Sequence, residues 1–210
     1  MKIVKFLGGI ALALLVAFVL YVGYLLVATW FSSTHVPIRK MVSYYEKNSS
    51  EMERLANYAN CAVDDSAYLW LMLYPNGDTG LQGSSNGIAD TLYGGIDGVD
   101  TVLCTVGLTG KECDTICQSL KAMGCIGVKV TPGRRETQVL YKYGGPFDEF
   151  PFGYILYSTP MTDEERINNL ENDHLVPYSD RVVFLMGWLG HGKKEAWMRK
   201  YKSEKKWRGI

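Results

Sequence analysis

The longest hydrophobic pattern lies near the start of the chain. Residues 6–31 form 26 consecutive positions without a charged side chain. A bilayer core about 30 Å thick needs about 20 apolar residues in a helix, so this stretch is long enough to span it. Aromatic residues gather toward its far end, where amphipathic rings favour the headgroup level. The pattern predicts a membrane-spanning helix over 6–31, with Tyr24, Trp30 and Phe31 at the membrane interface.

A cleaved signal peptide is the competing interpretation of this stretch. Residues 26–28, LVA, offer a cleavage site, but the apolar region of a signal peptide is only about 7–15 residues long. The length therefore favours a retained anchor. Lys2 and Lys5 precede the span, and a short basic tail usually stays inside, although basic residues also follow the span. We expect a single-pass protein of the plasma or inner membrane with its bulk extracytoplasmic, in the periplasm if the cell is bacterial.

Helical spacing of apolar residues predicts four further helices. Three begin with a capping box, in which a Ser or Thr and the Glu three residues later satisfy free backbone N–H groups of each other. The boxes are Ser50–Glu53, Thr109–Glu112 and Thr162–Glu165, for helices at about 51–61, 109–124 and 162–170; the fourth helix is at about 193–206. Gly124 is the C-terminal stop of the second capped helix.

Short runs rich in apolar and aromatic residues predict strands. The clearest is 67–74, AYLWLMLY, which ends at the turn signal PNGD. The others lie at 100–106, 125–131, 137–143, 153–159 and 181–186. Strands and helices mix without a regular βαβ alternation, so we expect an α+β fold with an N-terminal transmembrane helix and one mixed, largely antiparallel sheet domain with packed helices. The expected organisation is a transmembrane signal-anchor (1–32), a juxtamembrane helical segment (33–66) and an extracytoplasmic domain (67–210).

Residues 76–100 interrupt this pattern with seven glycines in twenty-five positions. Long loops without secondary structure are uncommon in compact domains and tend to be functional or mobile. The composition predicts a loop here, and it leaves open whether that loop serves a function or is a surface excursion.

Charge and motif searches exclude several kinds of chemistry. The 22 basic and 22 acidic residues balance, so bulk charge predicts no nucleic-acid partner. Residues 187–194, GWLGHGKK, have the spacing of a phosphate loop, but Lys194 stands where the Mg²⁺-binding Ser or Thr is required. The DTG at 78–80 has no second copy for an aspartic dyad. Three histidines and no hydrolase or zinc-protease signature lead us to expect no enzyme, no cofactor and no metal.

Residues 193–208, the predicted C-terminal helix and the two positions after it, carry eight basic residues against two glutamates, with a narrow aromatic stripe. Basic amphipathic helices with Trp dock on anionic headgroups or acidic partners. An ordinary surface helix, packed by its Trp stripe with its lysines in water, is the alternative. The residues that would make an anionic-surface or partner contact are Lys193, Lys194, Trp197, Arg199, Lys200 and Tyr201.

Three of the five cysteines fall within residues 111–125, in the spacing C-x3-C-x7-C. This spacing lacks the C-x2-C of zinc knuckles and of thioredoxin-like redox sites. Cys113 and Cys117 lie four residues apart, on the apolar face of the predicted helix. A disulfide framework is one interpretation, and five small buried hydrophobic side chains are the other.

Geometry suggests one disulfide first. If residues 100–106 form a strand and the next helix folds back over it, Cys104 and Cys117 lie at the same height along the two elements. Cys104–Cys117 is therefore the first-choice bridge, although packed helices usually keep their Cα atoms beyond disulfide reach. Cys61 then pairs with Cys113 or Cys125 and leaves one thiol odd.

The layout resembles that of a type IV pilin, with an apolar N-terminal helix, a polar helix and a cysteine-bearing α/β domain. With Gly9 as the processing residue, Leu14 stands where the family has a glutamate. The resemblance implies a structural subunit. By elimination we expect instead an anchored accessory, inhibitor or immunity-type protein that binds the bilayer through 6–31 and a protein or envelope component through its domain. An extracytoplasmic enzyme that uses a cysteine is a further alternative.

Overall fold

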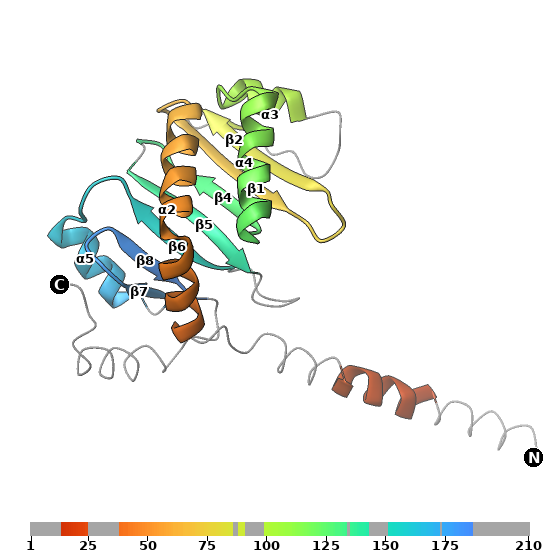
Figure 1. The fold of residues 1–210 in the computed structure, drawn as a ribbon. Helices are drawn as coiled ribbons and strands as arrows, with labels where there is room; N and C mark the ends of the chain where they lie inside the picture. The colour runs from red at the N-terminus through yellow and green to blue at the C-terminus, as the bar shows by residue number, and fades with distance from the viewer. Residues whose placement is uncertain are drawn as a thin grey trace, which may run out of the picture.

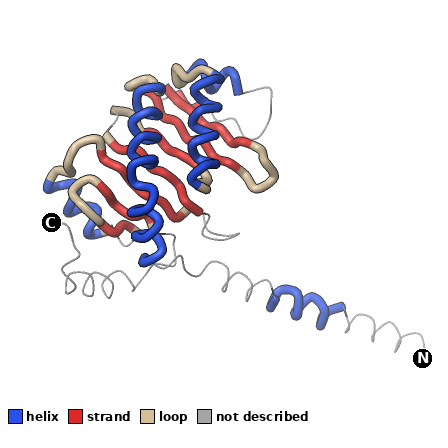
Figure 2. Tube along the Cα trace, viewed as in Figure 1, coloured by secondary structure: helices blue, strands red, loops and turns tan. Residues whose placement is uncertain are grey.

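The chain forms an α+β domain around one antiparallel sheet, as the sequence predicts (Figures 1 and 2). In the part of the chain that the structure describes, every strand pair is antiparallel. The structure, a computed structural model, describes residues 14–24, 38–85, 88–90, 99–133, 135–142, 151–172 and 174–186.

The sheet contains eight strands among the described residues, in the order β3-β2-β1-β4-β5-β6-β8-β7. The strands are β1 Ala67–Leu73, β2 Thr79–Ser85, β3 Ile88–Asp90, β4 Gly127–Val130, β5 Glu136–Lys142, β6 Phe152–Tyr157, β7 Leu175–Pro177 and β8 Val182–Leu185. The central strands come from the apolar runs of the sequence, and the edges are the short β3 and β7. Short edge strands limit edge-to-edge pairing with other chains.

Three helices pack on the same face of the sheet: α2 Ile38–Ala62, α3 Val99–Thr105 and α4 Gly110–Met123 (Figure 1). They share one hydrophobic core with the alternate side chains of β1, β4, β5, β6 and β8. Polar contacts fix α2 to the sheet as well: Thr137 donates a hydrogen bond to Asn60 (2.8 Å), and the Tyr154 hydroxyl donates to the Met41 carbonyl (3.0 Å).

The opposite face of the sheet is covered at one end only, among the described elements. Helix α5, Asp163–Glu171, lies beside β6, β7 and β8, where Ile155, Tyr157 and Val183 form a second small core. Asn169 of α5 donates a hydrogen bond to the Tyr157 hydroxyl (3.1 Å). Strand β6 is therefore buried on both faces, whereas β1, β2 and β4 each include half-buried residues.

Local sequence signals set the ends of α4 and α5 as predicted. Thr109 and Thr162 are N-caps, and each forms the reciprocal capping box with the glutamate three residues later. Gly124 adopts the left-handed conformation (φ 70°) after α4, so its backbone N–H reaches back to carbonyls of the last turn. Glycine takes this conformation without the steric cost of a Cβ.

The prediction for the helix before β1 is wrong about its start. Helix α2 begins at Ile38, and Ser50 lies in its interior rather than at its N-cap. The reason is a continuous apolar stripe: Ile38, Met41 and Val42 are buried at the same helical spacing as the later core residues. Burial of that stripe on the sheet outweighs the local capping signal.

Two predictions between residues 76 and 106 are also wrong. Residues 100–106, expected as a strand, belong mainly to α3, because Val102 and Val106 are four residues apart and pack together on β2. The glycine-rich stretch, expected as a loop, supplies β2 and β3. A Cβ at Gly83 would lie 2.5 Å from Val106 and 2.8 Å from Val102, so the missing side chain lets α3 approach the strand.

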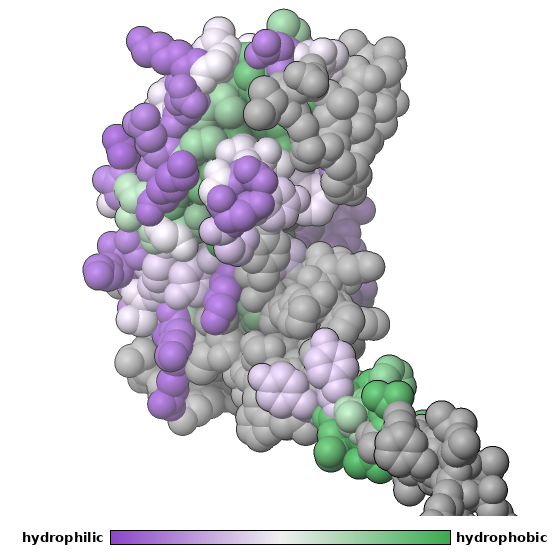
Figure 3. All heavy atoms as spheres, turned by 90° about the vertical axis from the view of Figure 1, so that its right-hand side faces the viewer, coloured by the Kyte–Doolittle hydropathy of each residue, from purple (hydrophilic) through white to green (hydrophobic). Residues whose placement is uncertain are grey.

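Residues 14–24 form a separate helical segment at the start of the described chain. Its apolar side chains are exposed, including Leu14 (67%) and Leu20 (68%), and they stand out in green in Figure 3. Among the described helices, none is long and apolar enough to cross a membrane. The span proposed for 6–31 extends beyond the described residues on both sides and stays a prediction.

Candidate functional site

The face of β1 that points away from the three core helices carries aromatic side chains. Leu69 and Leu71 lie in the core, so Tyr68 and Trp70 project from the opposite face of the strand. Both are half-buried. Trp and Tyr expose large amphipathic surfaces at little conformational cost and are enriched at binding interfaces.

Polar residues of the neighbouring strands surround these rings. Trp70 pairs in register with Gln82 of β2 and with Lys129 of β4, and Lys129 pairs with Gln138 of β5. The Lys129 ammonium lies 5.5 Å from the centroid of the Tyr68 ring, within cation–π range. We call this surface the Trp70 face; it consists of Tyr68, Trp70, Gln82, Ser84, Lys129 and Gln138, all half-buried.

The indole N–H of Trp70 is buried and donates to no acceptor among the described residues. Buried polar groups are nearly always hydrogen-bonded, and a lost partner costs about 1–3 kcal/mol. Burial of Tyr68 also raises the pKa of its hydroxyl above 10, so this hydroxyl stays a neutral donor at physiological pH. The Trp70 face thus offers hydrogen-bond donors from an ammonium and a phenol.

A row of alternating large and small residues borders the Trp70 face. Met72, Gly127, Leu140 and Gly153 lie side by side across β1, β4, β5 and β6. Leu140 is only 2% exposed, and a Cβ at Gly127 or Gly153 would lie 3.3–3.4 Å from it. The two glycines therefore make room for Leu140, which gives the sheet an apolar ridge next to the aromatic residues.

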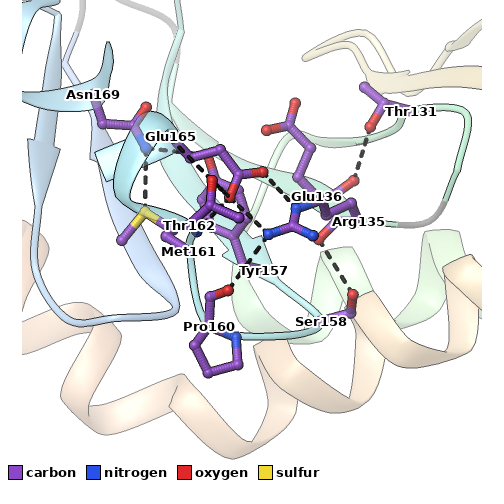
Figure 4. Close-up of polar contacts among 10 residues, drawn as sticks. All are labelled: Thr131, Arg135, Glu136, Tyr157, Ser158, Pro160, Met161, Thr162, Glu165 and Asn169. Carbon is purple, nitrogen blue, oxygen red and sulfur yellow. Dashed lines mark hydrogen bonds and ion pairs between the residues drawn. The ribbon is translucent and has the colours of Figure 1, made fainter. Parts of the chain in front are cut away.

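A second polar cluster connects β5 to α5 (Figure 4). Arg135 holds Glu165 with two hydrogen bonds, from Nε to Oε1 (2.5 Å) and from Nη2 to Oε2 (2.7 Å). Glu165 also accepts from the backbone N–H and hydroxyl of Thr162. The hydrogen bond from Arg135 is the main cause that lowers the pKa of Glu165 to about 2. A carboxylate so fully paired serves to fix α5 rather than to transfer protons.

We expect Glu165→Gln to lower the free energy of unfolding by less than about 1 kcal/mol at pH 7, because the pair is partly exposed. The folded-state pKa of about 2 lies below the ordinary value of 4.5. The stabilisation is therefore complete above pH 4.5 and is lost as the pH falls toward 2. Urea unfolding at pH 7 and near pH 2 measures this. The difference in free energy of unfolding between wild type and Glu165→Gln should become small at the acidic pH. The exposed Asp163–Arg166 pair gives the control: Asp163→Asn should change the free energy of unfolding very little. If Glu165→Gln destabilised the chain equally at both pH values, the assignment of the low pKa to Glu165 would be contradicted.

All five cysteines are free in the structure, so the Cys104–Cys117 bridge is not formed. The predicted bridge placed Cys104 on a strand, but Cys104 lies exposed on α3. Cys61 is exposed at the end of α2, Cys113 and Cys125 are buried, and Cys117 is half-buried. Cys125 lies 3.5 Å from the Tyr44 hydroxyl, which donates to the carbonyl of Met123 and so joins α2 to the end of α4.

The other predicted contact residues are largely outside the described chain. Tyr24 is described and exposed (68%). The remaining ones, Trp30, Phe31, Lys193, Lys194, Trp197, Arg199, Lys200 and Tyr201, lie outside the described residues, as does the phosphate-loop-like stretch 187–194.

Sequence reasoning missed the Trp70 face because it predicted 67–74 as a strand without separating the residues of its two faces. The signal was present in the alternation of Tyr68 and Trp70 with Leu69 and Leu71, which is the period of a two-faced strand. Lys129 carries the same signal in β4 between Val128 and Val130. The pairing that brings Trp70 beside Lys129 depends on the order of the strands, which a single sequence does not state.

The chain was also compared with known proteins. No family model, no curated protein and no solved structure matches it.

Proposed function

We propose that this chain is a single-pass membrane-anchored binding protein whose α+β domain holds a protein partner on the Trp70 face. The half-buried aromatic rings of Tyr68 and Trp70, on the sheet face opposite the three core helices, are the observation that carries the proposal. The Lys129 ammonium over the Tyr68 ring extends the same surface.

The chemistry of the face favours a protein with carbonyl or carboxylate groups at its contact surface. The donors are the Lys129 ammonium and the amides of Gln82 and Gln138, which lie in one register row with Trp70 across the four strands β2, β1, β4 and β5. Binding energy in protein interfaces concentrates in Trp, Tyr and Arg side chains surrounded by weaker polar contacts.

The anchor is part of the proposal. The charge-free run 6–31 would hold the chain in the membrane, and Lys2 and Lys5 would keep its N-terminus inside the cell. The exposed apolar side chains of residues 14–24 fit a segment that is surrounded by lipid rather than water. The domain would then lie outside the cytoplasm, in the place of an accessory, inhibitor or immunity-type protein.

Site-specific photocrosslinking in native membranes tests the binding face. A benzoylphenylalanine at position 82, in the Trp70 face, should give one crosslinked product, whereas the same probe at Tyr58 on the exposed side of α2 should not. Trp70→Phe keeps an aromatic side chain but reduces its contact area, and we expect about tenfold less product, equivalent to roughly 1.4 kcal/mol. Trp70→Ala should reduce it about thirtyfold or more, as for an interface hot spot.

Tyr58→Ala is the matched control for these variants and should leave the crosslink unchanged. Unfolding in urea must show that Trp70→Phe retains the wild-type midpoint. Equal products from positions 82 and 58, or full crosslinking by a folded Trp70→Phe variant, would contradict the proposed face.

A further inference from the structure

Two tyrosine rings lie in contact where α2 crosses β5 (Figure 1). The ring centroids of Tyr44 on α2 and Tyr141 on β5 are 4.2 Å apart, and the ring planes meet at 39°. Aromatic pairs usually keep their centroids about 4.5–7 Å apart, so this pair is unusually close. Among the described residues it is the closest pair of aromatic rings. The fold thus brings together two phenols that are 97 positions apart in the chain.

Contacts with the rest of the domain hold both rings in place. The Tyr44 hydroxyl donates to the Met123 carbonyl at the end of α4 and lies 3.5 Å from the Cys125 sulfur. Tyr141 lies where the register between β5 and β6 shifts, and irregularities of this kind re-aim a side chain. Both tyrosines are half-buried at the border of the main core. The rings are therefore fixed against each other while part of each stays open to small molecules in solution.

We propose that Tyr44 and Tyr141 form an oxidative crosslinking site, at which two peroxyl radicals join the two phenols as dityrosine. Each peroxyl radical takes the hydroxyl hydrogen atom of one tyrosine, so it becomes a hydroperoxide and leaves a phenoxyl radical. The two phenoxyl radicals form a carbon–carbon bond between the ring positions next to their oxygens. Each of these carbons then gives up its hydrogen and each oxygen regains one, which restores both aromatic rings. The protein loses two hydrogen atoms in total, and the peroxyl radicals are the only oxidant required.

Proximity decides which tyrosines couple within one chain. Tyr58 and Tyr74 are exposed (37% and 40%), so peroxyl radicals reach them readily. Neither ring, however, lies beside another aromatic ring in the part of the chain that the structure describes. Tyr154 is 6.2 Å from the Tyr44 ring and 6.3 Å from the Tyr141 ring, and close packing opposes the movement that a bond to it would need. The Tyr44–Tyr141 product should therefore dominate in the folded chain.

The crosslink would join α2 covalently to β5. It closes a loop between positions 97 apart in the chain, and a crosslink across a long loop stabilises a protein mainly by restraining its unfolded state. Oxidation at this pair would therefore strengthen the attachment of α2 to the sheet. This inference does not depend on the binding function proposed above.

The test exposes the full chain in detergent micelles to an azo initiator that releases peroxyl radicals in aerated buffer. Peptide mass spectrometry of the monomer band identifies the tyrosines that are joined, so coupling between molecules does not count. We expect one main product, which joins the peptides of Tyr44 and Tyr141 and lacks two hydrogens. The same reaction in concentrated urea should lose this preference, because the two rings are then apart. The crosslinked monomer should also unfold at a higher urea concentration than the untreated chain.

Phenylalanine variants assign the crosslink to this pair. Tyr44→Phe and Tyr141→Phe each keep a ring and remove one phenol, so each should abolish the product. Tyr58→Phe is the matched control and should leave the yield unchanged, and urea midpoints of the untreated variants show that each chain is folded. Oxidation of Tyr58 and Tyr74 in the folded wild type without the Tyr44–Tyr141 product would overturn the proposal. An equal yield of that product in concentrated urea would overturn it as well.

Discussion

Replacing Tyr154 by alanine should lower the free energy of unfolding by about 3–5 kcal/mol, the cost typical of removing a large buried aromatic side chain. Tyr154 is 0% exposed in β6. Its ring lies 5.3 Å from Phe184 and 5.7 Å from Tyr45, centroid to centroid, and its hydroxyl donates to the Met41 carbonyl of α2. The substitution leaves a cavity between α2 and the sheet, together with the loss of a hydrogen bond that joins them.

Urea unfolding of the full chain in detergent, followed by tyrosine and tryptophan fluorescence, measures this effect. Tyr154→Phe retains the packing and removes only the hydroxyl, so we expect a loss of about 1 kcal/mol. Tyr58→Ala, at an exposed position of α2, should change stability by less than about 0.5 kcal/mol. Similar urea midpoints for Tyr154→Ala and Tyr58→Ala would contradict the packing of α2 on this part of the sheet.

Local sequence signals predict the structure well where tertiary packing does not oppose them. The boxes at Thr109 and Thr162 each start a helix as predicted, because the residues before them are not helical. The box at Ser50 is equally good as a pattern, yet it lies within α2. A capping box contributes about 1 kcal/mol, whereas the buried residues Ile38 and Met41 extend the helix through tertiary packing. A single sequence shows the cap but not the surface on which α2 packs.

The same reasoning explains the errors in the strands and in the site. The β-branched side chains of Thr101, Val102 and Thr105 suggest a strand. The apolar residues of this segment, however, all face β2 only when the segment is helical. Gly83 favoured a loop prediction. The sequence alone does not show that α3 packs against this strand so closely that a side chain would not fit there. The Trp70 face depends on strand order, which brings Lys129 beside Trp70 although the two are 59 positions apart in the chain. Alternation could predict which residues share a face, but not their neighbours across the sheet.

Replacing Gly127 by alanine should destabilise the domain by about 3 kcal/mol, near the upper end for overpacked sites. A Cβ at this position would lie 2.5 Å from the Leu71 carbonyl oxygen and 2.5 Å from the Met72 sulfur. The sulfur can move, but the carbonyl belongs to β1, which pairs with β4 directly and holds its place in the sheet. The expected result is a lower urea midpoint with an unchanged slope, because the unfolded chain exposes the same surface.

Gly110→Ala is the matched control because it makes the same chemical change at a position with open space. Gly110 is the first residue of α4, and a Cβ there meets nothing within 4 Å. Alanine is the better helix former and restricts the unfolded chain, so Gly110→Ala should stabilise the domain by up to about 1 kcal/mol. The two substitutions should therefore have opposite signs. If both stabilised the domain, β4 would not pass as close to β1 as the register requires, and the ridge of Met72 and Leu140 beside the Trp70 face would have a different shape.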